Sequence, residues 1–142
     1  MIQEDKELLL KDLSARLPYG VKIDIPDLFL STKTNVEVLN ELFCGDDGEF
    51  RCNDSGMLIK YVKPYLFPLS SMTEEQRDEL YKIGWYLDED KIYSCFRNYD
   101  DSNYKTHIDS FELINWCYKN NFDINGLIPK GLANDATGLN IY

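Results

Sequence analysis

The sequence contains a single histidine, His107, and no two cysteines lie at the short spacing typical of a structural zinc site. The four cysteines are Cys44, Cys52, Cys95 and Cys117. Zinc sites usually present close pairs of ligands, so we expect no bound metal. In a reducing compartment such thiols are commonly buried and inert, and we interpret all four in this way.

Phosphate-binding motifs of nucleotide-binding proteins are also absent, since the sequence contains neither GxxxxGKS/T nor GxGxxG. A cysteine nucleophile would need a neighbouring base, and His107 is the only imidazole in the chain. Acidic pairs lie in predicted turns, and the stretch DDSNYKTHID lacks the glycine of a calcium loop. We therefore expect no cofactor and no catalytic residues. A small hydrolase or metal enzyme built on Cys, Asp or Glu side chains is the alternative.

Long apolar runs and an excess of basic residues are absent as well. No run approaches the roughly 20 residues that span a bilayer, and the acidic N-terminal stretch MIQEDKELLLKDL is unlike a secretory signal. We therefore expect a cytoplasmic protein without membrane contact. Acids outnumber bases by 25 to 15, for a net charge of -10. Such a surface repels phosphate backbones, so we expect no direct nucleic-acid binding.

The 142 residues, 44% of them hydrophobic, suit one compact domain with a real core. Leucines four apart predict a helix over residues 3–17, which Pro18 and Gly20 end. The stretch VKIDI alternates and predicts a half-buried strand. Residues 34–43 suit either a strand or a helix, and we favour the strand. With turns at GDDG and NDSG, the first part predicts a helix followed by a small antiparallel bent sheet or partial barrel.

The stretch KPYLFPLSSMTEEQ, residues 63–76, is predicted to be a structural connection between the two halves of the chain, which we call the joint. Pro64 and Pro68 lie four apart, so the PxxP spacing of polyproline ligands is absent. Each proline favours an extended residue before it. Thr73 and Gln76 form a predicted capping box that starts a helix over residues 74–83. The joint allows a subdivision of the single domain into residues 1–63, with a helix and strands, and a helical half at 64–142.

The second half is expected to be mainly helical, apart from a short strand at residues 91–97. Phe111, Ile114 and Cys117 recur at helical spacing and predict the buried face of a helix that ends at Asn120 and Asn121. A thiol on such a face is a poor nucleophile. The tail is expected to pack back as a loop, and the whole chain is predicted to have an α+β fold.

Aromatic and acidic residues are dense between positions 85 and 104. Core packing is favoured for most of the aromatic rings, but so dense a group is hard to bury completely, and a protein-binding surface is the alternative. The predicted interaction surface consists of Trp85, Tyr86, Asp88, Glu89, Asp90, Tyr93, Tyr99, Asp100, Asp101 and Tyr104.

Three blocks of the sequence, LLLKDLSARLPYGVK, IKYVKPYLFPLSSMTEEQ and SFELINWCYKNNFDINGLIPKGLA, resemble a family of small acidic proteins of phages, prophages and mobile elements of anaerobic gut bacteria. The resemblance implies an accessory protein and no particular reaction. It departs from the family at Asn120 and Asn121, near which relatives carry histidine.

We therefore expect a non-enzymatic accessory protein that binds an unidentified protein in the cytoplasm of a host bacterium. An acidic mimic of nucleic acid that inhibits a host DNA-binding defence protein is a further alternative. The sequence does not predict an oligomeric state.

Overall fold

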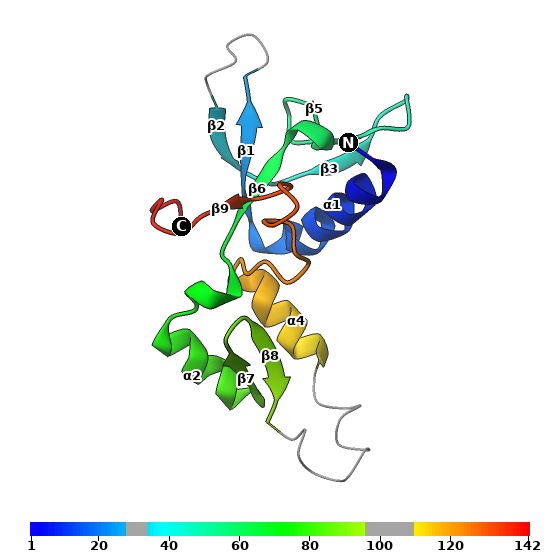
Figure 1. The fold of residues 1–142 in the computed structure, drawn as a ribbon. Helices are drawn as coiled ribbons and strands as arrows, with labels where there is room; N and C mark the ends of the chain where they lie inside the picture. The colour runs from blue at the N-terminus through cyan, green and yellow to red at the C-terminus, as the bar shows by residue number, and fades with distance from the viewer. Residues whose placement is uncertain (28–33, 96–109) are drawn as a thin grey trace.

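The computed structural model describes residues 1–27, 34–95 and 110–142 and shows an α+β fold (Figure 1). Its elements follow one another along the chain as α1 (Gln3–Arg16), η1 (Leu17–Tyr19), β1 (Lys22–Pro26), β2 (Thr34–Val38), β3 (Leu42–Cys44), β4 (Phe50–Cys52), β5 (Met57–Leu58), η2 (Ile59–Tyr61), β6 (Lys63–Leu66), η3 (Leu69–Ser71), α2 (Glu74–Lys82), β7 (Trp85–Asp88), β8 (Lys91–Ser94), α4 (Ser110–Lys119) and β9 (Asn134–Asp135).

The first elements form as the sequence predicts. The helix α1 is followed by a short 3-10 turn at Pro18, and Gly20 reverses the chain with a φ of 67°, a left-handed conformation that glycine adopts without steric cost. In β1, Ile23 and Ile25 are buried while Lys22 and Asp24 between them are half-buried. The period-2 alternation is thus confirmed.

The described strands form several small sheets instead of one bent sheet or partial barrel. The largest has the order β2-β1-β6-β9, in which only the β6–β9 pair is parallel. The other two are the antiparallel β3-β4-β5 sheet and the β7-β8 hairpin. Strands β2 and β3 confirm the extended prediction for residues 34–43.

Two hydrophobic clusters divide the described chain into two lobes. The first lobe, residues 1–27, 34–66 and 125–142, buries α1 against the larger sheet and is completed by Leu127 and Leu132 from the tail. The second lobe, residues 67–95 and 110–124, packs α2, the β7-β8 hairpin and α4 around Leu80 and Phe122 (Figure 1). The tail therefore rejoins the first lobe after the chain has formed the second. The prediction of a single domain stays a prediction.

The C-terminal half is not clearly mainly helical. The described part of residues 64–142 has two α-helices, α2 and α4, alongside the strands β6, β7, β8 and β9. Aromatic and β-branched residues such as those of WYLD and KIYS suit a pleated hairpin better than a helix. The tail contributes β9, because Asn134 pairs with Tyr65 of β6.

The predicted joint connects the two lobes. Pro64, Tyr65 and Leu66 are buried in β6, inside the first lobe. The next residue, Phe67, bridges to the strand-like segment after α4: its N–H donates to the carbonyl of Asn121 at 2.8 Å, and its carbonyl accepts from the N–H of Asp123 at 2.9 Å. The capping box is also confirmed, since both of its hydrogen bonds form at the start of α2.

A buried polar network ties α1 to the end of α4. Arg16 Nε donates to Asp12 Oδ1 at 2.6 Å, and neither side chain is exposed to solvent. Arg16 Nη2 also donates to the carbonyl of Phe122 at 2.6 Å. Asn125 Nδ2 donates to Asp12 Oδ2 at 2.8 Å, and the guanidinium lies 4.8 Å from the ring centre of Tyr118. This network joins the two lobes through side chains far apart in sequence.

Candidate protein-binding site

The helix α4 presents two large apolar side chains to solvent. Phe111 is 77% exposed and Ile114 is 41% exposed, so the prediction that both lie on the buried face is wrong. The face that packs against the second lobe instead carries Leu113, Trp116 and the buried Cys117. The helical spacing was correct, but an apolar face wider than the available core leaves one side uncovered.

The backbone conformation of Asn121 determines where α4 ends. Asn121 has a φ of 64°, its N–H donates to the carbonyl of Tyr118, and the N–H of Phe122 donates to the carbonyl of Cys117. These two bonds form a Schellman motif, for which asparagine is the common substitute for glycine. The predicted end at Asn120 and Asn121 is thus confirmed. The motif turns the chain so that Ile124 packs against the second lobe.

An apolar groove of about 230 Å³ lies beside the exposed face of α4. Every side chain that lines it is apolar or a thiol: Leu69, Ile92, Leu113, Ile114, Cys117 and Ile124. Ile114 belongs both to this groove and to the exposed face, so Phe111, Ile114 and the groove form one continuous feature of the helix. We call these seven residues the α4 groove site.

The predicted interaction surface is only partly within the described residues. Trp85 packs against the second hydrophobic cluster, while Tyr86 and Tyr93 pair across the hairpin with ring centres 5.7 Å apart. The hairpin turn and its flank expose the three acids Asp88, Glu89 and Asp90. Tyr99, Asp100, Asp101 and Tyr104 lie outside the described residues. The structure thus places these hairpin residues in the same lobe as the α4 groove site.

Acidic side chains dominate the described surface of the second lobe. Its exposed acids are Glu74, Glu75, Asp78, Glu79, Asp88, Glu89, Asp90 and Glu112. Its exposed bases are Arg77, Lys82, Lys91 and Lys119. Eight acids against four bases give the lobe around the groove a negative potential that attracts cationic groups.

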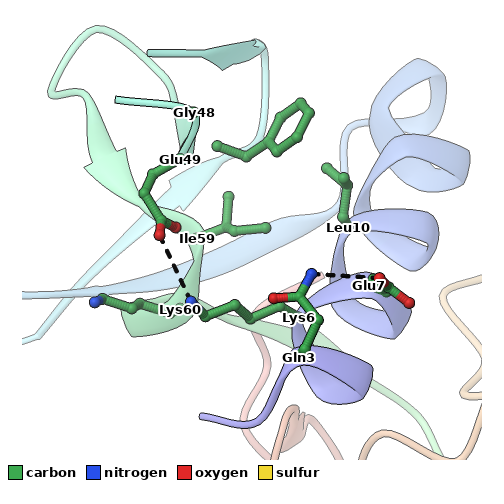
Figure 2. A pocket seen from close by; sticks show the side chains of 9 residues that line it. Gln3, Lys6, Glu7, Leu10, Gly48, Glu49, Ile59 and Lys60 are labelled. Atoms are coloured by element: carbon green, nitrogen blue, oxygen red, sulfur yellow. Dashed lines mark hydrogen bonds and ion pairs between the residues drawn. The ribbon is translucent and has the colours of Figure 1, made fainter. Parts of the chain in front are cut away.

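A second cavity, of about 310 Å³, lies in the first lobe between α1 and β4 (Figure 2). Its apolar walls include Leu10, Phe50 and Ile59. At its rim, Lys6 Nζ lies 3.6 Å from Glu49 Oε1, and Gln3 donates to Glu7 at 3.3 Å. These polar side chains contact one another at the rim, and the cavity lies in a different lobe from the α4 groove site.

The two buried thiols are poorly suited to nucleophilic chemistry. Burial raises the pKa of the Cys117 thiol to about 12 and that of the Cys52 thiol to about 11. Both therefore stay protonated near neutral pH, and the thiolate is the reactive form. Cys117 contributes to the groove as a small apolar side chain. His107, the only imidazole, lies outside the described residues.

We expect the thiols to differ sharply in their reactivity toward a thiol-specific reagent at pH 7.5. The prediction that all four cysteines are buried is wrong for Cys44, which is exposed and should be labelled first. Cys52 and Cys117 should react only after denaturation, because both are buried and protonated. Mass spectrometry of labelled peptides over time distinguishes the sites. Labelling of Cys117 in the folded protein at the rate of Cys44 would contradict this assignment.

The described residues contain neither a cluster of metal-binding side chains nor a helix that could span a membrane. No group of three or more His, Cys, Asp or Glu side chains there could hold a metal ion, and no helix there is long and apolar enough to cross a membrane. Comparisons of the chain with protein-family models, with curated proteins and with solved structures found no match. Function is therefore inferred from the geometry and chemistry of the described residues.

Proposed function

We propose that the chain is a non-enzymatic binding protein that docks another protein on the α4 groove site. The observation that carries the proposal is the exposure of Phe111 and Ile114 beside an apolar groove. A single exposed apolar residue is ordinary, but neighbouring large ones that border a groove are typical of interaction sites. Aromatic anchors of this kind supply much of the binding energy in protein interfaces.

The partner that best fits this site is a protein segment with a large apolar side chain flanked by lysine or arginine. The groove accepts the apolar group, and the exposed acids of the second lobe attract the basic ones. Charge complementarity of this kind mainly raises the association rate, so binding is expected to weaken with added salt.

The resemblance to small acidic proteins of phages and mobile elements supports a role as an accessory factor in the cytoplasm of a host bacterium. A partner in that setting is a host protein or a protein of the same element. The exposed acids of α2, Glu74 with Asp78 and Glu75 with Glu79, favour mimicry of nucleic acid as a second candidate. A mimic would compete with DNA for its partner, and changes in the groove would leave that competition intact.

The test begins with a photo-reactive residue placed at position 114 of the full chain in a bacterial host. The protein that is cross-linked there is identified, purified and titrated by calorimetry. Ile114→Glu is expected to weaken binding by about 10-fold to 100-fold, because a buried apolar anchor contributes about 1.5–3 kcal/mol.

The matched control is Tyr81→Glu, which adds the same charge at a side chain that is 66% exposed on α2 and does not line the groove. This variant should bind normally. Equal binding by Ile114→Glu and the wild type would refute the α4 groove site, and so would equal weakening by the two variants.

A further inference from the structure

The strand β2 forms an open edge of the largest sheet. Within residues 1–27, 34–95 and 110–142, it pairs with β1 on one side and has no other strand beyond it in the sheet order β2-β1-β6-β9. Figure 1 likewise draws β2 at the margin of the sheet, next to β1. Its valines are exposed, Val36 by 49% and Val38 by 46%.

The hydrogen-bond pattern shows which backbone groups of β2 face outward. The N–H of Leu39 donates to the carbonyl of Val21 at 2.8 Å, so this pair is hydrogen-bonded. Hydrogen-bonded pairs alternate along an antiparallel ladder, and residues 37 and 35 therefore also bond toward β1. The N–H and C=O groups of residues 34, 36 and 38 consequently point away from β1, toward the open edge.

This edge has only one of the features that usually prevent pairing. Lysine, proline and inward-pointing charges commonly protect edge strands. The strand reads TNVEV, without lysine or proline. Its one charge, Glu37, lies on the same inward face as the buried Ile23 of β1, but it already accepts a hydrogen bond from Asn53 at 3.3 Å within the same copy. The exposed side chains Val36 and Val38 are apolar, and no described strand pairs with the outward backbone groups of β2.

The sequence of β2 is complementary to itself in one antiparallel register. With Val36 opposite Val36 of a second copy, all three outward residues of each strand lie in hydrogen-bonded positions, which gives about six bonds. Asn35 then lies opposite Glu37 of the other copy, and an amide is a good donor to a carboxylate. The valines meet on the exposed face.

The neighbouring registers are poorer. Centring the pair on Glu37 places two carboxylates directly opposite each other, which destabilises a strand pair, and leaves about four bonds. Centring it on Asn35 also gives about four bonds and removes the valine contact. The register centred on Val36 is thus favoured by both backbone and side chains.

We propose that two copies of this chain associate through antiparallel pairing of β2 with β2, with Val36 on the two-fold axis. The larger sheet then continues from one copy into the other. This surface lies in the first lobe and is independent of the α4 groove site.

The pair is a small interface, so the association is expected to be weak, with a Kd between about 10 µM and about 1 mM. Each copy carries a net charge of -10, and added salt should strengthen the dimer by screening their repulsion. The opposite salt dependence is expected at the α4 groove site.

The test uses opposite charges at the two-fold axis. Analytical ultracentrifugation from about 10 µM to about 1 mM should show the wild type shifting from monomer to dimer. Val36→Lys and Val36→Glu should each be monomeric, because like charges would meet at the axis. An equimolar mixture of the two variants should dimerise again, because residue 36 of one copy then meets the opposite charge on the other.

Tyr81→Lys serves as the control, since it changes the net charge as Val36→Lys does but lies on α2. It should dimerise like the wild type. Circular dichroism of each variant confirms that its fold is kept, as expected for a substitution at a half-exposed side chain. A wild type that stays monomeric at about 1 mM overturns the proposal. The proposal is also overturned if Val36→Lys or Val36→Glu dimerises alone, or if their mixture stays monomeric.

Discussion

Replacing Arg16 by methionine is expected to lower the free energy of unfolding by about 3–5 kcal/mol. The guanidinium is completely buried, and its removal leaves the equally buried Asp12 carboxyl group without its main partner. The carbonyl of Phe122 loses its donor as well. Urea denaturation followed by the fluorescence of Trp85 and Trp116 measures the loss.

The chain has a matched control for this prediction. Asp47 and Arg51 form an ion pair with the same spacing and a contact of 2.8 Å, but both side chains are partly exposed. Water already solvates these charges, so Arg51→Met should change the stability far less than Arg16→Met. Equal losses for the two substitutions would show that burial does not control the effect.

A double replacement separates the charge from the packing. Asp12→Leu combined with Arg16→Met removes both ions, so no uncompensated charge stays in the core. This variant should be more stable than Arg16→Met alone. If it were less stable, the network would depend mainly on the hydrogen bonds of Asp12 with Asn125 and of Arg16 with Phe122.

Phe122→Ala is the second substitution with a large expected effect, a loss of about 3–5 kcal/mol. Its ring is almost completely buried and stacks on Trp116 with a centroid distance of 5.6 Å. Removing the ring leaves a cavity in the second lobe, which the surrounding side chains cannot fill without moving. Thermal and urea denaturation both report the change.

Phe111→Ala is the control for Phe122→Ala, because it removes the same side chain from an exposed position of α4. We expect it to change the stability by less than about 0.5 kcal/mol. A loss close to that of Phe122→Ala would mean that Phe111 packs against the protein in solution, and it would also weaken the case for the α4 groove site.

Several helix ends, strands and turns could be predicted because each is determined by residues that are close together in the sequence. The capping box of Thr73 and Gln76, the alternation in β1 and the turn at Asn121 each depend on residues within a few positions. The strand β9 has only two residues and forms because it meets Tyr65 and Leu66. Its two-residue sequence carries no strand pattern that could be recognised beforehand.

The buried network and the exposed face of α4 could not be predicted from sequence for a related reason. Asp12 with Arg16 and Asp47 with Arg51 have the same residues at the same spacing, yet only the first pair is buried. The difference arises from groups more than 100 positions away, such as the carbonyl of Phe122. Similarly, the spacing of Phe111 and Ile114 indicates a helix face but not what covers it.

The return of the tail to the first lobe bears on how the protein is made. A ribosome completes residues 67–124 before the strand β9 and the apolar residues Leu127 and Leu132 emerge. The second lobe thus has its whole cluster at a stage when the first lobe still lacks one strand and part of its interior. During synthesis, the middle of the polypeptide is therefore ready to fold before its beginning.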